Sequence, residues 1–220
     1  MEKAELIAAA TAEIAQPTLS VTRQFLTIHA VAYEAGAPKV AGVDWHKEKK
    51  LGIVYFAVEK EKFYLAISLS AAQPGFQPAP QWMWAQEWNR IAFRAASEIL
   101  TSQQLMALTT LKPTASWEKG SQRKGAGAKH KYSSIEFVPH PEPGEFGVML
   151  KKLLDFLAQD AAGVQALVDK AAGYVQITSV FHNGNTTLSG LHLDKECIQR
   201  LATLNLEIDF DLYAEGNFYR

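Results

Sequence analysis

The chain has 220 residues, and its 22 Lys or Arg side chains against 23 Asp or Glu give a formal net charge of −1. A nucleic-acid-binding protein usually has a clear basic excess, so this balance argues against that class. Hydrophobic residues make up 48% of the chain, which is enough for a sizeable core and argues against global disorder. Cys197 is the single cysteine, so an intrachain disulfide and a cysteine-based zinc site are both excluded.

Two early carboxylates, Glu2 and Glu5, break the basic start and the apolar run that a secretory signal needs. No run of about 18 apolar residues occurs in the chain, so no transmembrane helix is predicted. We therefore expect a cytoplasmic protein without membrane contact.

Residues 1–70 are predicted to form one helix followed by a meander of strands. Apolar residues recur at helical spacing up to Ile14, and Pro17 ends that helix. A polar turn at Glu59–Lys62 separates two apolar runs and predicts a hairpin. The expected elements are a helix over residues 2–15, a strand over 22–33, a loop over 35–43, and hairpin strands over 51–58 and 63–69.

Residues 71–88 are rich in proline and tryptophan and are predicted to be a linker between two regions. Because buried aromatic side chains are far commoner than aromatic cages, we expect the tryptophans to pack this linker onto a core. A cage of aromatic rings around a ligand is the alternative. The residues in question are Pro74, Pro78, Pro80, Trp82, Trp84 and Trp88.

Residues 89–220 are predicted to form an α+β domain. Short strands alternate with amphipathic helices, which is typical of one sheet with helices packed on one face. We expect a mainly antiparallel sheet in a sandwich of the ferredoxin-like type, preceded by the N-terminal helix and β-meander. The predicted elements are strands over 89–97, 132–138, 174–181 and 205–213, and helices over 101–108, 146–159, 164–170 and 194–202.

The segment Leu111–Gly120 combines a helix stop with a tryptophan beside charged residues. Pro113 ends the preceding helix, and Thr114 is expected to make a backbone hydrogen bond. Trp117 is either an anchor that holds the helix end against the sheet or a contact residue for a partner.

This segment also begins a family resemblance. The motif Leu111-x-Pro113-Thr114, followed by Trp117 and Lys119-Gly120, and the terminal Asp209-x-Asp211-x-Tyr213 carry it. Over about residues 91–213 the chain resembles an uncharacterised bacterial domain of unknown function, found mainly in short cytoplasmic proteins. The resemblance implies no reaction and no catalytic residues. Some such proteins look like immunity proteins of toxin systems, so the resemblance suggests an inhibitor of a toxin.

Three carboxylates alternate on the last predicted strand, at Glu207, Asp209 and Asp211. Neighbours in this stripe are roughly 6 to 7 Å apart on one strand face. Three interpretations are open: a solvated strand face, a surface for a basic protein partner, or oxygen ligands for a hard cation such as Mg²⁺.

The glycine- and lysine-rich loop Lys119–Lys131 is the second candidate site. Its backbone N–H groups suit a phosphate, but the spacing of a nucleotide-binding loop is absent, so a solvated loop is the expected state.

Catalytic constellations are not found: there is no Gly-x-Ser-x-Gly motif, and the histidines other than His46 lack metal-ligand spacing. Asp44 and His46 have a spacing that permits a metal pair, but two ligands without a third make a chance occurrence the expected case. We therefore predict a non-enzymatic protein-binding module with no cofactor, and we predict no catalytic or metal-ligating residue. A metal-dependent enzyme that uses the acidic stripe and a structural or sensory module are the alternatives. The sequence leaves the oligomeric state open. The predicted contact residues are Trp117, Lys119, Glu207, Asp209, Asp211 and Tyr213.

Overall fold

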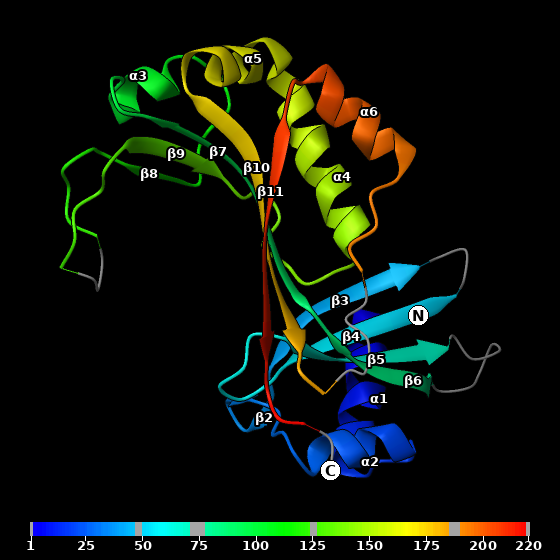
Figure 1. The fold of residues 1–220 in the computed structure, drawn as a ribbon. Coiled ribbons are helices and arrows are strands. Elements are labelled where there is room, and N and C mark those ends of the chain that lie inside the picture. The colour runs from blue at the N-terminus through cyan, green and yellow to red at the C-terminus, as the bar shows by residue number, and fades with distance from the viewer. Residues whose placement is uncertain (1, 47–49, 71–77, 124–126, 185–189, 219–220) are drawn as a thin grey trace.

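Two sheets organise the chain, which Figure 1 shows as a computed structural model. The structure describes residues 2–46, 50–70, 78–123, 127–184 and 190–218. The N-terminal sheet has the strand order β3-β4-β5-β6, and the C-terminal sheet has the order β11-β10-β7-β9-β8. Together with their helices and a short β1-β2 ribbon, these sheets confirm the predicted α+β class.

The elements follow one another in two groups. The first group is α1 Lys3–Ala15, α2 Ser20–Leu26, β1 Tyr33–Glu34, β2 Ala37–Pro38, β3 Val40–His46, β4 Leu51–Ala57, β5 Tyr64–Ser70 and β6 Ala79–Gln86. The second is β7 Trp88–Ser97, α3 Ser102–Met106, β8 Ala115–Trp117, β9 Ser133–Phe137, α4 Phe146–Leu157, a 3-10 turn Ala158–Asp160, α5 Ala161–Lys170, β10 Ala172–His182, α6 Lys195–Thr203 and β11 Glu207–Glu215. No described helix is both long and apolar enough to cross a membrane.

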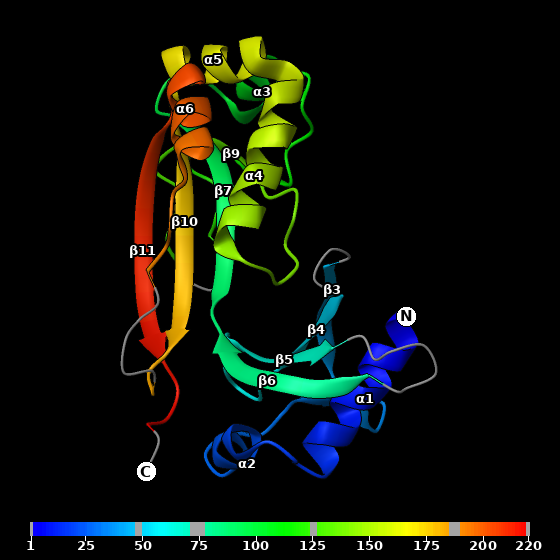
Figure 2. The ribbon, with the colours of Figure 1, turned by 90° about the vertical axis from the view of Figure 1, so that its right-hand side faces the viewer.

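The strand predicted over residues 22–33 is wrong, because its first part is the helix α2. Thr22 and Phe25 lie three residues apart, and both are buried on the inward side of this helix. In a seven-residue segment this spacing is too short to distinguish a helix from a buried strand. Helices α1 and α2 cover the same side of the N-terminal sheet, and Figure 2 shows them below it while α4 stands above.

The loop predicted over residues 35–43 is wrong from Ala37 onward, because β2 and the start of β3 lie there. The linker predicted over residues 71–88 is wrong from Ala79 onward, because β6 pairs with β5 in the N-terminal sheet. Residues 71–77 lie outside the described part of the chain. Strand β6 is the edge of its sheet, and an edge strand tolerates Pro80 without losing an inner hydrogen bond. Only Glu87 separates β6 from β7, so the chain passes directly from one sheet into the other.

The C-terminal sheet is mainly antiparallel, with one parallel pair. Strand β10 runs antiparallel to β7 and parallel to β11, and α6 supplies the crossover that a parallel pair requires. Helices α4, α5 and α6 cover one face of this sheet, as Figure 1 shows, with Leu150, Leu154 and Leu157 of α4 buried against it. The prediction of helices on one face is confirmed.

A buried pair of histidines joins the N-terminal helices to the end of β10. The Nε2 atoms of His29 and His182 lie 2.8 Å apart, and Phe25 packs against both rings. The N–H of Gly184 donates to Nδ1 of His182 at 3.2 Å. Neutral His182 therefore carries its proton on Nε2 and donates it to His29. A backbone interaction with Asn217 acts on the pKa of His29 in the opposite direction to burial, and burial is the larger effect.

Acidification is predicted to destabilise the fold through this pair. Burial lowers the pKa of His29 below its usual value of 6.5, so the unfolded chain binds a proton that the folded chain does not. The stabilisation is complete above the unfolded pKa and is lost as the pH falls below it, by up to about 1.4 kcal/mol per pH unit. Urea unfolding between about pH 7.5 and pH 5.5 measures this loss.

His29→Gln is expected to flatten this pH dependence, whereas His140→Gln, at a half-exposed site, is expected to retain it. An unchanged slope in His29→Gln would contradict the assignment.

Candidate functional site

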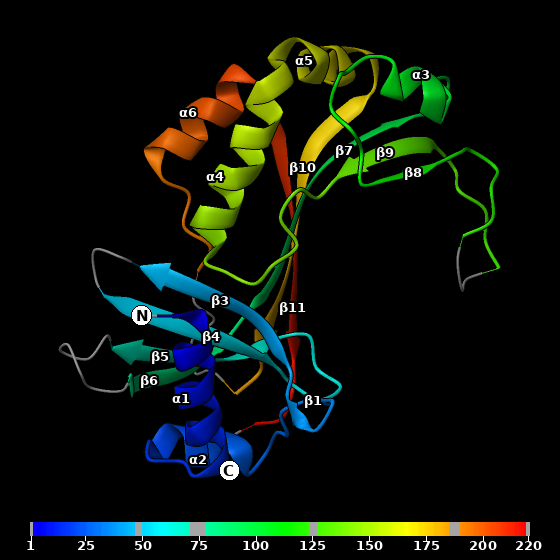
Figure 3. The same cartoon turned by 180° about the vertical axis from the view of Figure 1, so that it is seen from behind.

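The face of the C-terminal sheet turned away from α4, α5 and α6 is polar, and we call it the helix-free face. Side chains alternate along each strand, so Ile91 and Phe93 of β7 enter the helix-covered core while Arg90 and Arg94 point the other way. The strand registers place side chains of the other strands beside these arginines. No described helix lies over this face in Figures 1 and 3. From β8 to β11 the face presents Trp117, Ser134, Glu136, Arg90, Arg94, Tyr174, Gln176, Thr178, Glu207, Asp209, Asp211 and Tyr213.

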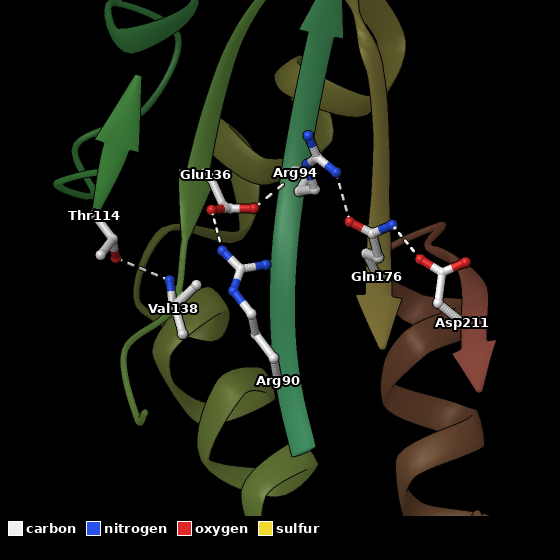
Figure 4. A network of polar contacts seen from close by, with 7 residues as sticks. All are labelled: Arg90, Arg94, Thr114, Glu136, Val138, Gln176 and Asp211. Carbon is white, nitrogen blue, oxygen red and sulfur yellow. Dashed lines mark hydrogen bonds and ion pairs between the residues drawn. The ribbon is translucent and has the colours of Figure 1, made fainter. Parts of the chain in front are cut away.

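Glu136 of β9 is the centre of a polar network on this face. Its side chain is only 5% exposed, and its two oxygens pair with Arg90 and with Arg94, the latter at 3.4 Å from Nε (Figure 4). Both arginine side chains are about a third exposed. A buried carboxylate with charge-assisted bonds to two cations is well compensated. The network therefore fixes two arginines whose guanidinium groups still reach solvent.

Gln176 of β10 extends this network to the sheet edge. Nη1 of Arg94 donates to Oε1 of Gln176 at 2.5 Å, and Nε2 of Gln176 donates to Oδ2 of Asp211 at 2.9 Å (Figure 4). A glutamine has one acceptor end and one donor end, so this orientation satisfies both the arginine and the carboxylate. Side chains of β9, β7, β10 and β11 are thus connected across the face.

Thr114 and Glu118 attach β8 to its neighbours. The N–H of Thr114 donates to the carbonyl of Glu136 at 2.7 Å, and its hydroxyl accepts from the N–H of Val138 at 2.9 Å (Figure 4). The predicted backbone hydrogen bond of Thr114 is confirmed. The Glu118 carboxylate accepts from the N–H of Ser102 at 2.9 Å, and this bond lowers its pKa.

Trp117 and Lys119 lie at the β8 side of the face. Trp117 is half-buried and stacks on the ring of His130, with 5.8 Å between ring centroids. The anchoring contact therefore reaches the loop after β8, whereas the sequence suggested contact with a helix end. Lys119 is exposed, and its Nζ donates to the backbone carbonyl of Glu98 at 3.0 Å.

A basic hollow of about 700 Å³ lies beside this loop, against Ser134 and Tyr174 of the helix-free face. Its charged lining is Arg94, Arg123, Lys129, Lys131 and Glu98. Lys124 and Gly125 of the same predicted phosphate loop lie outside the described residues. The helix-free face is consequently basic at its β8 end and acidic along β11.

The six predicted contact residues form two groups at opposite edges of the C-terminal sheet. Strands β9, β7 and β10 separate these groups, so the residues do not make a single cluster. Trp117 and Lys119 lie at the β8 edge, and Glu207, Asp209, Asp211 and Tyr213 lie on β11 at the opposite edge.

The acidic stripe of β11 has the predicted alternation. Asp211 accepts a hydrogen bond from Gln176, whereas Glu207 and Asp209 are exposed. In the part of the chain that the structure describes, no three His, Cys, Asp or Glu side chains converge as a metal site requires.

Sequence reasoning did not select Arg90, Arg94, Glu136 or Gln176 as site residues. Part of the signal was present, since an arginine at alternate positions of an apolar strand must point away from the core. The register that sets Glu136 opposite Arg94 could not be read from the sequence, because the two residues lie 42 positions apart in separate strands.

The fold and the face define a class: an α+β domain with a mixed sheet, covered by helices on one face and polar on the other. Residues 86–215 match the family model of a domain of unknown function, DUF4279, and the chain belongs to this family. This match confirms the predicted resemblance to a domain of unknown function and runs from the end of β6 to the end of β11. The search of curated proteins and the search of solved structures found no match.

Glu136→Ala is expected to lower the free energy of unfolding by about 2 kcal/mol, because two arginines lose their buried carboxylate. The partial exposure of both arginines keeps the cost below that of a fully desolvated pair. Urea unfolding measures the change. Glu142→Ala, which removes an exposed carboxylate, is the control and should cost under about 0.5 kcal/mol. Equal stability of Glu136→Ala and the wild type would show that the network is not structural.

Proposed function

We propose that the chain is a protein-binding module whose contact surface combines the edge strand β11 with the helix-free face. One observation carries this proposal. Strand β11 has nine residues, it pairs with β10 on one side, and no described strand pairs with its other edge. A free row of backbone N–H and C=O groups is a template for a strand of a partner.

The side chains of β11 support a partner contact. Phe210, Leu212 and Tyr213 are 39%, 54% and 52% exposed, and Figure 2 shows their strand on the outside of the sheet. Aromatic and apolar side chains on an uncovered strand favour a contact that removes them from water.

The charge of the strand indicates the kind of partner. If two copies paired antiparallel through β11 in one continuous sheet, the carboxylates of Asp209 and Asp211 from both copies would gather on one face. Like charges opposite each other on a sheet are destabilising. A partner strand or surface that carries Lys or Arg complements the stripe instead.

The specific case suggested by the family resemblance is an inhibitor of a bacterial toxin. If a toxin gene lies beside the gene for this chain, deletion of the latter should stop growth while the toxin is intact. Normal growth after that deletion would contradict the hypothesis of a toxin inhibitor. The proposal of a protein-binding module would then depend on the binding test below.

The binding test uses the double variant Glu207→Lys, Asp209→Lys, which reverses two exposed charges outside the polar network. We expect a protein captured from the native host by the wild-type chain to bind this variant at least about tenfold more weakly. The double variant Glu59→Lys, Glu142→Lys reverses two exposed charges elsewhere and should bind like the wild type. Equal binding by all three chains would contradict the proposed surface.

Trp117→Ala tests the other end of the same face. A small loss of stability together with lost binding would support a place for Trp117 in the contact surface. Because this indole is half-buried and stacks on His130, we expect a loss of stability of about 1 kcal/mol, measured by thermal unfolding. A large loss of stability with unchanged binding would assign Trp117 to packing alone.

A further inference from the structure

A cleft runs along β6, an edge strand of the N-terminal sheet, and is also lined by Val21 and Gln24 of α2 and by the start of α4. It has a volume of about 660 Å³, which is in the range of small-molecule sites. Figure 2 shows the N-terminal end of α4 above β6. The lining residues that matter for recognition are Trp82, Trp84, Glu87, Glu145, Phe146 and His192.

Residues 82–86 of β6 and the residue after it form one wall of the cleft, and this wall includes two tryptophans. Trp82 and Trp84 stand two positions apart on β6, so their side chains share the face opposite the α1 side of the sheet. Trp82 is 63% exposed. Nε1 of Trp84 donates to Oε1 of Gln86 at 2.9 Å, which fixes the position of that ring. A tryptophan with most of its surface in water favours an apolar ligand group placed against it.

The charged lining of the cleft is entirely acidic. Glu87 and Glu145 are its carboxylates, and none of the described lining residues is Lys or Arg. Glu145 is the residue before α4, and its side chain makes no capping hydrogen bond with that helix. His192 is the remaining titratable side chain among the described lining residues.

Glu87 is the more buried of the two carboxylates. Burial raises its pKa, and the charge of Glu145 adds to this rise, although Asn89 donates a hydrogen bond to Oε1 of Glu87 at 3.3 Å. A bound cation beside the two carboxylates would offset both effects.

We propose that this cleft binds a small organic cation, an ammonium group that carries an apolar body. The faces of Trp82 and Trp84 contact the alkyl groups next to the ammonium nitrogen, and the carboxylates of Glu87 and Glu145 balance its charge. Indole faces attract cations through the ring quadrupole, and aromatic walls are the usual means of binding quaternary ammonium groups. The inference is independent of the proposed protein-binding surface.

The structure therefore gives the tryptophans of the predicted linker different environments. Trp82 and Trp84 line the cleft, while Trp88 lies under the ammonium group of Lys62, with 5.7 Å from Nζ to the ring centroid. Trp84 also packs against the buried cluster of Ile53, Tyr55 and Ala66, in line with the expected packing role.

Calorimetric titration of the full chain with three probes tests the proposal. The probes are choline, benzyltrimethylammonium, and 3,3-dimethylbutan-1-ol, which has the shape of choline without its charge. We expect both cations to bind and the neutral probe to bind at least about tenfold more weakly than choline.

Glu87→Gln should weaken choline binding by about tenfold, because it keeps the shape of the side chain and removes the charge. Glu142→Gln removes a carboxylate three positions before Glu145 that does not line the cleft, and its affinity should stay within about twofold of wild type. Trp82→Ala should weaken choline binding by about fivefold or more. Because Trp82 is mostly exposed, this variant is expected to fold, so it tests the proposal even if Glu87→Gln is unstable.

Equal affinity for choline and its neutral analogue would show that the cleft recognises only the apolar group and not the charge, and this result would overturn the proposal. Absence of binding by both cations up to about 10 mM would overturn it as well.

Discussion

The alternation of side chains along β7, β9 and β10 is the constraint on which the C-terminal domain depends. One set of alternate residues, such as Phe93, Ile135 and Ile177, must be buried, and α4, α5 and α6 cover that set. The other set is then forced to the opposite face, where no described helix lies. The polar network, the basic hollow and the acidic edge therefore arise from the same division of each strand into an apolar side and a polar side.

Glu136 makes this polar face a defined surface. Arg90 and Arg94 lie four positions apart on β7 and would repel each other without a carboxylate between them. The buried Glu136 pairs with both, and Gln176 links Arg94 to Asp211. Preorganised side chains lose little conformational entropy when a partner binds. The cleft on the N-terminal side has a different character, since its recognition groups are indole rings and carboxylates. The two proposals therefore concern two separate surfaces and two unlike ligands, one macromolecular and one small.

The sequence predicted those parts of the fold that local patterns determine. The capped helices α3 and α6, the amphipathic α4 and the β4-β5 hairpin each carry their own signal, and all four are present. Errors arose where tertiary context decides the structure: α2 is too short for its periodicity to be distinctive, and the prolines near β6 are tolerated because that strand is an edge. For the site, the acidic alternation of β11 was visible in the sequence. The pairing of Glu136 with Arg90 and Arg94 depends on long-range register, which no local pattern specifies.

The central claim, that β11 and the helix-free face bind a protein partner, is tested most directly by amide hydrogen exchange with and without that partner. The account predicts that exchange slows at the outward-facing N–H groups of residues 207–215 when the partner is bound, because those groups gain hydrogen-bond acceptors. Unchanged exchange along β11, together with protection on another surface, would contradict it.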